Sequence, residues 1–290
     1  MEIVTRYACY SYGAPPVGCM LQVCSAASRI IGSPSVRSRE KKTAMTYSVQ
    51  QWFQILFSID IWVFTIILSC AFPVAGYLLF RSLKELRDNN LNSRKLRTYA
   101  YIILSEWAFV ITLLWLSHKH GLSISDLGEN LGNMNSTVIT TIVLLAIFAI
   151  MVFFNVRQLR KMKLEKLETE LGPLKMFLPS NKPEFIAFIL IAFTAGICEE
   201  LLYRGWLQNL LVYGTGSVWI GLVVGAIIFG FGHAYQGKMG IVQTGIYGLI
   251  LGGVFIFTKS LVAGQVLHVI VDAVNGMVGG YALSLLKAKS

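Results

Sequence analysis

Charged residues are scarce in this chain of 290 residues. Asp, Glu, Lys and Arg make up 14% of it, whereas soluble domains contain roughly 25%. Hydrophobic residues make up 55%, and the mean hydropathy is +0.62. A single water-soluble core could not bury this much apolar surface, and the apolar residues come in long blocks. We therefore predict a polytopic integral membrane protein.

Cysteine is also sparse, and its spacing excludes two classes of site. The chain has five cysteines and no CxxC pair, namely Cys9, Cys19, Cys24, Cys70 and Cys198. An odd number, with two in apolar stretches, argues against a disulfide framework and against a thiolate metal site. The net charge of +10 does not indicate a nucleic-acid partner. Lys and Arg lie in blocks between apolar runs, which is typical of membrane topology.

Seven nearly uncharged apolar stretches follow one another along the chain. They lie at about residues 55–80, 99–116, 138–154, 185–211, 218–233, 242–257 and 261–286. Each approaches the roughly 20 residues that cross a bilayer as a helix. Lipid offers no hydrogen-bond partners to the backbone, so the spans should be helical. The predicted fold is an all-α transmembrane bundle of about seven spans (six to eight) around a membrane-embedded polar cavity.

The connections between these stretches indicate how the chain is oriented. Residues 81–98 contain six Lys or Arg and residues 155–184 contain seven, whereas the connection between the second and third spans contains only Lys119. Basic loops stay on the cytoplasmic side. We therefore expect both basic loops in the cytoplasm and the amino terminus outside.

Residues 1–44 conflict with that orientation, because their six basic residues should resist translocation. Two interpretations remain: a poorly ordered basic extension, or translation that begins at Met45, which we favour. The segment is not an ordinary signal peptide. We divide the rest into residues 45–184, with the first spans and their cytoplasmic loops, and residues 185–290, the core in which the polar residues gather.

Ionisable residues inside spans are costly and are usually kept there for a function. The fourth span contains Glu199, Glu200 and Arg204. Glu200 and Arg204 are four residues apart and can pair on one helix face, whereas Glu199 points about 100° away and must meet another neighbour. The fifth span ends at His233. The last contains His268 and, four residues later, Asp272.

Each of these residues has an ordinary interpretation. A lone buried histidine is more often structural than catalytic, and Glu with Arg at helical spacing often forms a neutralising pair. We interpret Asp60 and Glu106, the acidic residues of the earlier spans, as structural residues near the interface. The concentration of two Glu, two His and one Asp in the last hundred residues instead indicates a functional polar site.

Three ordered motifs carry a resemblance over about residues 185–286. They are E-E-x-x-x-R at Glu199, Glu200 and Arg204, F-x-x-x-H at Phe229 and His233, and H-x-x-x-[ND] at His268 and Asp272. With these motifs the sequence resembles the CPBP family of intramembrane endopeptidases. That family includes the type II CAAX prenyl endopeptidases and bacteriocin-processing or bacteriocin-immunity relatives.

The resemblance implies hydrolysis of a peptide bond in a membrane-associated or lipid-anchored protein, with prenylated proteins among the candidate substrates. By analogy Glu199 is the general base, His233 assists the attacking water, and His268 with Asp272 faces the oxyanion. Glu200, Arg204 and Phe229 support the site. The prenyl-protein branch has Asn where this chain has Asp272. An ionised Asp272 would hold His268 in position and make His268 the donor.

Glu199, His233 and His268 could also form a three-ligand zinc site. The chain has no H-E-x-x-H, and the three ligands would come from three helices. We therefore expect metal-free glutamate catalysis and no cofactor. Strict alternation of spans places His233 near the cytoplasmic end and His268 toward the outer end. We thus expect short or tilted helices around a water-filled cavity.

Two other classes of function compete. A proton-coupled transporter should show inverted repeats with broken helices in matching halves, whereas here the polar residues gather in one half. A catalytically silent scaffold or immunity protein is the other alternative. The expected partners are a membrane-associated substrate and the lipid bilayer, not nucleic acid. The expected location is the bacterial cytoplasmic (inner) membrane.

Overall fold

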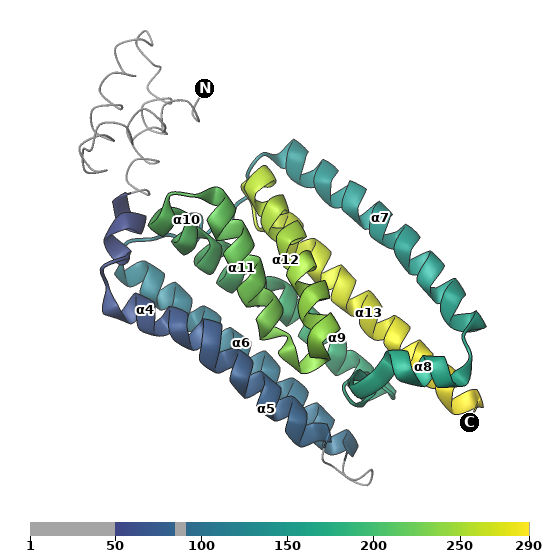
Figure 1. Cartoon of the computed structure of the whole chain (residues 1–290). Helices are drawn as coiled ribbons and strands as arrows, with labels where there is room; N and C mark the ends of the chain where they lie inside the picture. Colours follow the sequence, from purple (N-terminus) through teal and green to yellow (C-terminus); the bar gives the residue numbers. More distant parts are fainter. Residues whose placement is uncertain (1–49, 85–90, 290) are drawn as a thin grey trace. The chain divides into compact units, whose positions relative to one another are not determined.

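The computed structural model describes residues 50–84 and 91–289, and these residues form helices without any strand (Figure 1). The predicted all-α fold is confirmed. The proposed extension at 1–44 and the alternative start at Met45 lie outside the described residues.

Six helical segments in this part are long and apolar enough to cross a membrane, and a seventh apolar helix is shorter. The long ones are Ile59–Ser82, Arg94–Lys119, Met134–Lys161, Lys182–Thr215, Ala234–Thr258 and Val262–Ala288, and the short one is Val218–Gly232. An apolar helix is therefore present at each of the seven predicted stretches, and six of these helices are long enough to cross a membrane. The first begins at Ile59 rather than near residue 55, after a turn that follows a short helix.

The spans are built from the following elements. The first comprises α4 (Ile59–Ile66), η1 (Ile67–Ala71) and α5 (Phe72–Lys84), and the next two are α6 (Leu91–Lys119) and α7 (Met134–Lys161). The basic connection contains α8 (Leu164–Leu171) and η3 (Gly172–Met176). The later spans are α9 (Lys182–Glu199) with η4 (Glu200–Gln208) and α10 (Asn209–Thr215), then α11 (Val218–Gly232), η5 (Ala234–Gln236) with α12 (Gly237–Thr258), and α13 (Val262–Lys289).

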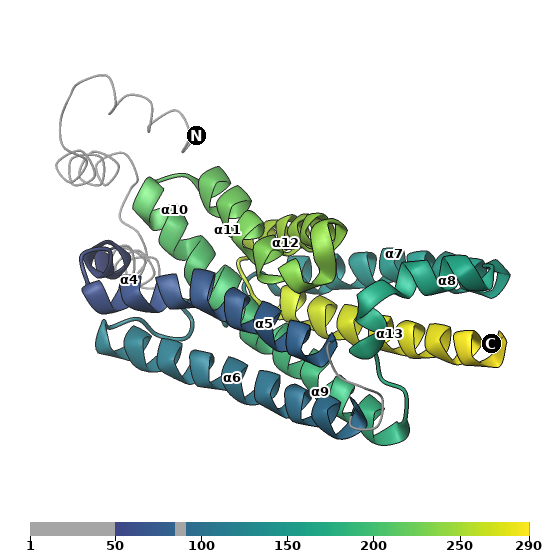
Figure 2. The ribbon, with the colours of Figure 1, turned by 60° about the horizontal axis from the view of Figure 1, so that its bottom comes forward.

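Helix α9 lies between α6 and α13 in the middle of this bundle (Figure 2). On the far side of α13 lies α7, whose most apolar window is only 6% buried. Such an apolar, unburied helix is suited to contact with lipid. The central position of α9 explains why it can hold charged residues, because side chains there meet protein rather than hydrocarbon.

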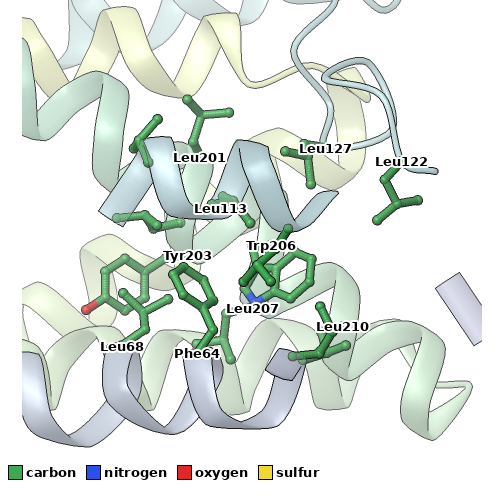
Figure 3. Close-up of a cluster of buried hydrophobic side chains, with 14 of the residues drawn as sticks. Phe64, Leu68, Leu113, Leu122, Leu127, Leu201, Tyr203, Trp206, Leu207 and Leu210 are labelled. Atoms are coloured by element: carbon green, nitrogen blue, oxygen red, sulfur yellow. The ribbon is translucent and has the colours of Figure 1, made fainter. Parts of the chain in front are cut away.

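The fourth span changes its winding at its centre. Directly after Glu199 the helix continues as the π-helix η4, and all nine residues of η4 are buried. Figure 3 shows Trp206 and Leu207 of this segment among Phe64, Leu68 and Leu113 of neighbouring helices. The Trp206 indole donates from Nε1 to Thr65 Oγ1 at 3.2 Å, which leaves this ring both packed and hydrogen-bonded. π-helical turns often occur at functional sites.

The two basic connections lie at the same end of the bundle, as predicted (Figure 1). The end of α5, the start of α6, the end of α7 and the carboxyl terminus gather there. A buried ion pair joins the start of α6 to the start of α9: Lys95 Nζ lies 2.9 Å from Glu184 Oε2, and the side chains are 3% and 0% exposed. Lys95 also donates to the Leu178 carbonyl, and Glu184 accepts from Ser180 and Asn181.

Asp60 lies at the other end of the bundle. Its Oδ2 atom is 2.7 Å from Lys119 Nζ and 3.1 Å from His120 Nε2, and its side chain is 28% exposed. These contacts agree with the structural role expected of Asp60.

The Lys95–Glu184 pair gives a stability prediction. Glu184→Leu removes every acceptor of the carboxylate and strands the Lys95 ammonium in a buried setting. We expect it to lower the free energy of unfolding by about 3 to 5 kcal/mol. The matched control is Glu168→Leu, since Glu168 pairs with Lys175 but its side chain is 59% exposed. The control should cost less than about 1 kcal/mol. Chemical unfolding of the two purified variants measures both changes. Equal losses of unfolding free energy would show that the buried pair stabilises the protein no more than the exposed one.

Candidate active site

One buried carboxylate oxygen connects two of the three motifs. Glu200 is 0% exposed, and its Oε1 atom accepts from Arg204 Nη1 at 2.8 Å and lies 2.9 Å from His268 Nδ1. The predicted Glu200–Arg204 pair is therefore confirmed. Because a carboxylate only accepts, His268 must donate through Nδ1. This contact ties η4 to α13.

The Arg204 guanidinium brings in the remaining motif. Its Cζ atom lies 4.1 Å from the centre of the Phe229 ring on α11, a cation–π arrangement that is favourable when water is excluded. Phe229 thus supports the site by holding the cation that neutralises Glu200.

Glycine allows α9 and α13 to approach closely beside this pair. A Cβ atom at Gly196 would lie 2.4 Å from Val269 Cγ2 and 2.8 Å from the Val269 backbone nitrogen. No side chain fits at such distances, so the position requires glycine for close approach. The close packing brings His268, which precedes Val269, to the glutamates that follow Gly196.

The second ring nitrogen of His268 faces two further carboxylates. Its Nε2 atom is 3.5 Å from Asp272 Oδ2 and 3.8 Å from Glu199 Oε2. Neither distance is that of a direct hydrogen bond, and both permit one through a small shift or a water. The ring itself is 3% exposed, whereas the Asp272 side chain is 35% exposed.

Glu199 differs from Glu200 in accepting no hydrogen bond from the described residues through either oxygen, whereas Glu200 accepts two through Oε1. Its side chain is 12% exposed, and its Oε2 atom is buried without a hydrogen-bond partner. A buried polar atom left unpaired is unusual and indicates a bound water or ligand, or a reactive role. Glu199 therefore faces a different environment from Glu200, as its position on the helix predicts.

That environment is a cavity of about 100 Å³ between α5, α6 and the start of η4. Glu199, Glu106 and His233 contribute its carboxyl and imidazole groups, and Tyr203 and Tyr235 also line it. Apolar side chains of α5 and α6 form much of the remaining wall, among them Phe72, Pro73, Leu79, Phe80 and Ile102. A mostly apolar pocket with a few convergent polar groups is typical of a substrate site.

His233 reaches this cavity because α11 is short. The helix has 15 residues, or about 22 Å at 1.5 Å per residue, and ends at Gly232, so His233 follows its last turn. The Phe229 ring on α11 lies 6.2 Å from the His268 ring on α13. One helical turn further along α11 comes His233, and one turn further along α13 comes Asp272. The expected short helix is confirmed, and it brings the two histidines to neighbouring depths.

The ring of His233 is held in place from one side. Its Nδ1 atom is 3.0 Å from the Phe229 carbonyl oxygen, so Nδ1 donates and Nε2 remains as an acceptor in the neutral ring. The ring packs against Phe229 at 4.8 Å and Tyr235 at 5.9 Å between centres.

The expectation that Glu199, His233 and His268 all line one cavity is met for two of them. Glu199 and His233 form part of the wall, whereas His268 lies behind Glu199 and contacts it from the α13 side. Asp272 lies next to His268. The cavity is thus built from both halves of the described chain.

The interpretation of Glu106 as an interfacial residue is wrong. Glu106 is 3% exposed and lines the cavity. The sequence contained a signal: Glu106 is the only charged residue in the apolar stretch 99–116, which is the criterion that identified Glu199. Tyr247 was also missed. Its ring lies 5.6 Å from that of His268 and its hydroxyl is buried without a partner, but a tyrosine in an apolar span gives no such signal.

The donor set does not fit the zinc alternative. Within the described ranges no three His, Cys, Asp or Glu side chains are grouped as a metal ion requires. His268 directs Nδ1 to Glu200, and Glu199 is 3.8 Å from Nε2. As they are placed here, Glu199, His233 and His268 are not grouped in the three-ligand arrangement of the zinc alternative.

Comparison with known families identifies the segment that holds this site. Residues 181–274 match the family model described as type II CAAX prenyl endopeptidase Rce1-like. No curated protein and no solved structure gave a significant match. The matched segment contains all three motifs and confirms the resemblance drawn from them. The chain is thus a multi-pass integral membrane protein, and its residues 181–274 are similar to the Rce1-like family.

The different surroundings of the adjacent glutamates predict different effects on stability. Glu200→Gln weakens the attachment of both Arg204 and His268, so we expect a loss of about 3 to 5 kcal/mol in the free energy of unfolding. Glu199→Gln breaks no hydrogen bond and should change it by less than about 1 kcal/mol.

A double-mutant cycle separates the ion pair from general disturbance. Arg204→Met combined with Glu200→Gln removes both charges, so its cost should be smaller than the sum of the two single changes. Additive costs, or a Glu199→Gln protein as unstable as Glu200→Gln, would contradict the assigned surroundings.

Proposed function

We propose that this chain hydrolyses a peptide bond in a membrane-associated or lipid-anchored protein, using a water that Glu199 activates. The observation that carries the proposal is the Glu199 carboxylate, whose buried Oε2 atom has no hydrogen-bond partner among the described residues and which lines the same cavity as His233. His268 Nε2 is 3.8 Å away, beyond direct hydrogen-bond distance, so the carboxylate remains available to take a proton from water. The Rce1-like match over residues 181–274 supports the reaction class.

The positions of the surrounding groups suggest a catalytic role for each. His233, whose Nδ1 donates to Phe229, can accept a hydrogen of the attacking water through Nε2 and orient it. Glu199 takes the other hydrogen as the oxygen attacks the carbonyl carbon. His268 is fixed at Nδ1 by Glu200. Its Nε2 atom, when protonated and oriented by Asp272, donates to the oxyanion.

The cavity restricts the substrate. A space of about 100 Å³ holds one side chain or a few waters, at roughly 30 Å³ for each water. It therefore admits an extended segment of peptide and excludes a folded domain. The apolar side chains of α5 and α6 favour an apolar residue beside the scissile bond. Competition between prenylated peptides and peptides with another lipid tests whether the lipid on the substrate is a prenyl group.

A metal-free mechanism and a cytoplasmic location of the basic loops belong to the same proposal. The donor geometry supports the first, and the six and seven basic residues of loops 81–98 and 155–184 support the second. We place the protein in the bacterial cytoplasmic membrane, with residues 81–98 and 155–184 facing inward.

One argument against a transporter was that the polar residues gather in one half of the chain. That argument is weaker now, because Glu106 is a buried carboxyl group in the first half. The family match still favours hydrolysis over transport. For a catalytically silent scaffold, no contact in the described part gives specific support.

The activity prediction concerns Glu199. Glu199→Gln keeps the shape and removes the base, so cleavage of an apolar, lipid-anchored peptide by purified protein should fall by about 10² to 10⁴. Glu168→Gln, a matched change at an exposed carboxylate, should leave the rate unaltered. Mass spectrometry of the products measures both.

Two results would contradict the proposal. Near wild-type cleavage by Glu199→Gln would remove Glu199 from the mechanism. Loss of cleavage after prolonged treatment of the wild type with a chelator, restored by added zinc, would refute metal-free catalysis.

A further inference from the structure

Glu106 is a buried carboxyl group that the proposed mechanism has not used. It lies on α6, outside the matched residues 181–274, so the family match assigns it nothing. It is 3% exposed, its Oε2 atom is buried without a hydrogen-bond partner, and it lines the same cavity as Glu199 and His233. Thr98 and Ile102 line the cavity too, and their spacing of four residues shows that one face of α6 forms this wall.

A structural role does not account for this placement. Among the described residues that line the cavity, none is Lys or Arg, and the neighbouring Arg204 is committed to Glu200. Glu106 therefore neutralises no cation there. It also bridges no helices, because its buried oxygen accepts from no group in the described chain.

Two carboxyl groups in so small a cavity cannot both be charged without strong repulsion. The arrangement with one proton shared between Glu106 and Glu199 avoids this cost, as in other paired carboxyl sites. A pair of this kind can supply a base and an acid at the same time. Glu199 lies 3.8 Å from His268 and shares the cavity with His233, and the proposed mechanism activates the water there, so Glu106 is left with the proton.

We propose that Glu106 is a catalytic acid that protonates the leaving amine of the scissile peptide bond. This inference rests on the proposed function of the site. The water O–H bond breaks and its proton passes to Glu199 as the oxygen–carbon bond forms. The carbon–nitrogen bond then breaks while the nitrogen takes the proton of Glu106. A carboxylic acid and an amine are released, and the pair again holds one proton, now on Glu199. Transfer of that proton to Glu106 through cavity water restores the starting state.

The test compares two substrates that differ in their leaving group. One is the lipid-anchored peptide of the activity assay, and the other is its thioester analogue, in which sulfur replaces the scissile N–H. A thiolate leaves without prior protonation, since a thiol has an ordinary pKa near 8.5, whereas an amide nitrogen must be protonated. Glu106→Gln should therefore lower peptide cleavage by about 10² or more and thioester cleavage by less than about tenfold.

Matched variants distinguish loss of the acidic group at position 106 from a change in the shape of the cavity wall. Glu199→Gln should slow both substrates by similar factors, because both need an activated water. Thr98→Val, an isosteric change on the same face of α6, should leave the ratio of the two rates at the wild-type value. Glu106→Asp keeps an acid but withdraws it by one methylene, so its ratio should lie between those of wild type and Glu106→Gln.

The ratio of the two rates does not depend on how much protein folds, because both substrates are cleaved by the same preparation. A Glu106→Gln protein with wild-type peptide cleavage, or with equal loss on both substrates, would overturn the role of Glu106 and leave the proposed function intact. A wild-type protein that cleaves neither substrate would overturn the proposed function and the inference with it.

Discussion

The contact between Glu200 and His268 is the interaction on which the rest of the site depends. One oxygen of a fully buried carboxylate accepts from Arg204 on its own helix and from His268 on another. In a low-dielectric interior such charge-assisted hydrogen bonds are strong, and losing either partner leaves a charge that nothing else solvates. The contact fixes the orientation of His268 and the depth of α13 relative to η4. With Glu200 engaged, Glu199 remains the adjacent carboxylate that can face the cavity.

Close helix packing delivers this geometry. Gly196 lets α13 approach α9 directly opposite the glutamates, and the short α11 ends where His233 can line the cavity. The π-helix η4 begins immediately after Glu199 and carries Glu200 and Arg204 in a buried, tightly packed segment. The apolar cluster around Trp206 anchors this segment against α4 and α6 (Figure 3). The Glu199 carboxylate thus lies between this tightly packed segment and the cavity.

Local sequence rules predicted a large part of this arrangement. Length and hydropathy gave the seven helices in order, because the bilayer demands long apolar helices. Helical spacing gave the Glu200–Arg204 pair. The same spacing rule paired His268 with Asp272, but the shortest side-chain contact of His268 is with Glu200, 68 residues earlier. Such a tertiary partner follows from how α9 and α13 dock, which residue spacing cannot specify. The role of Glu106 was missed for a related reason. It depends on a cavity whose other walls come from distant segments, and residue spacing does not predict that cavity.

The central claim is that a peptide bond is cleaved in the cavity shared by Glu199, His233 and Glu106. The most direct measurement is an experimental structure of Glu199→Gln bound to an uncleaved lipid-anchored peptide. The account predicts that the scissile carbonyl carbon lies in this cavity, with the side chains at 199 and 233 on the side of the attacking water and Glu106 next to the scissile nitrogen. A peptide bound elsewhere, for example in the apolar groove between α7 and α12 lined by Val143, Leu144 and Ile250, would contradict it.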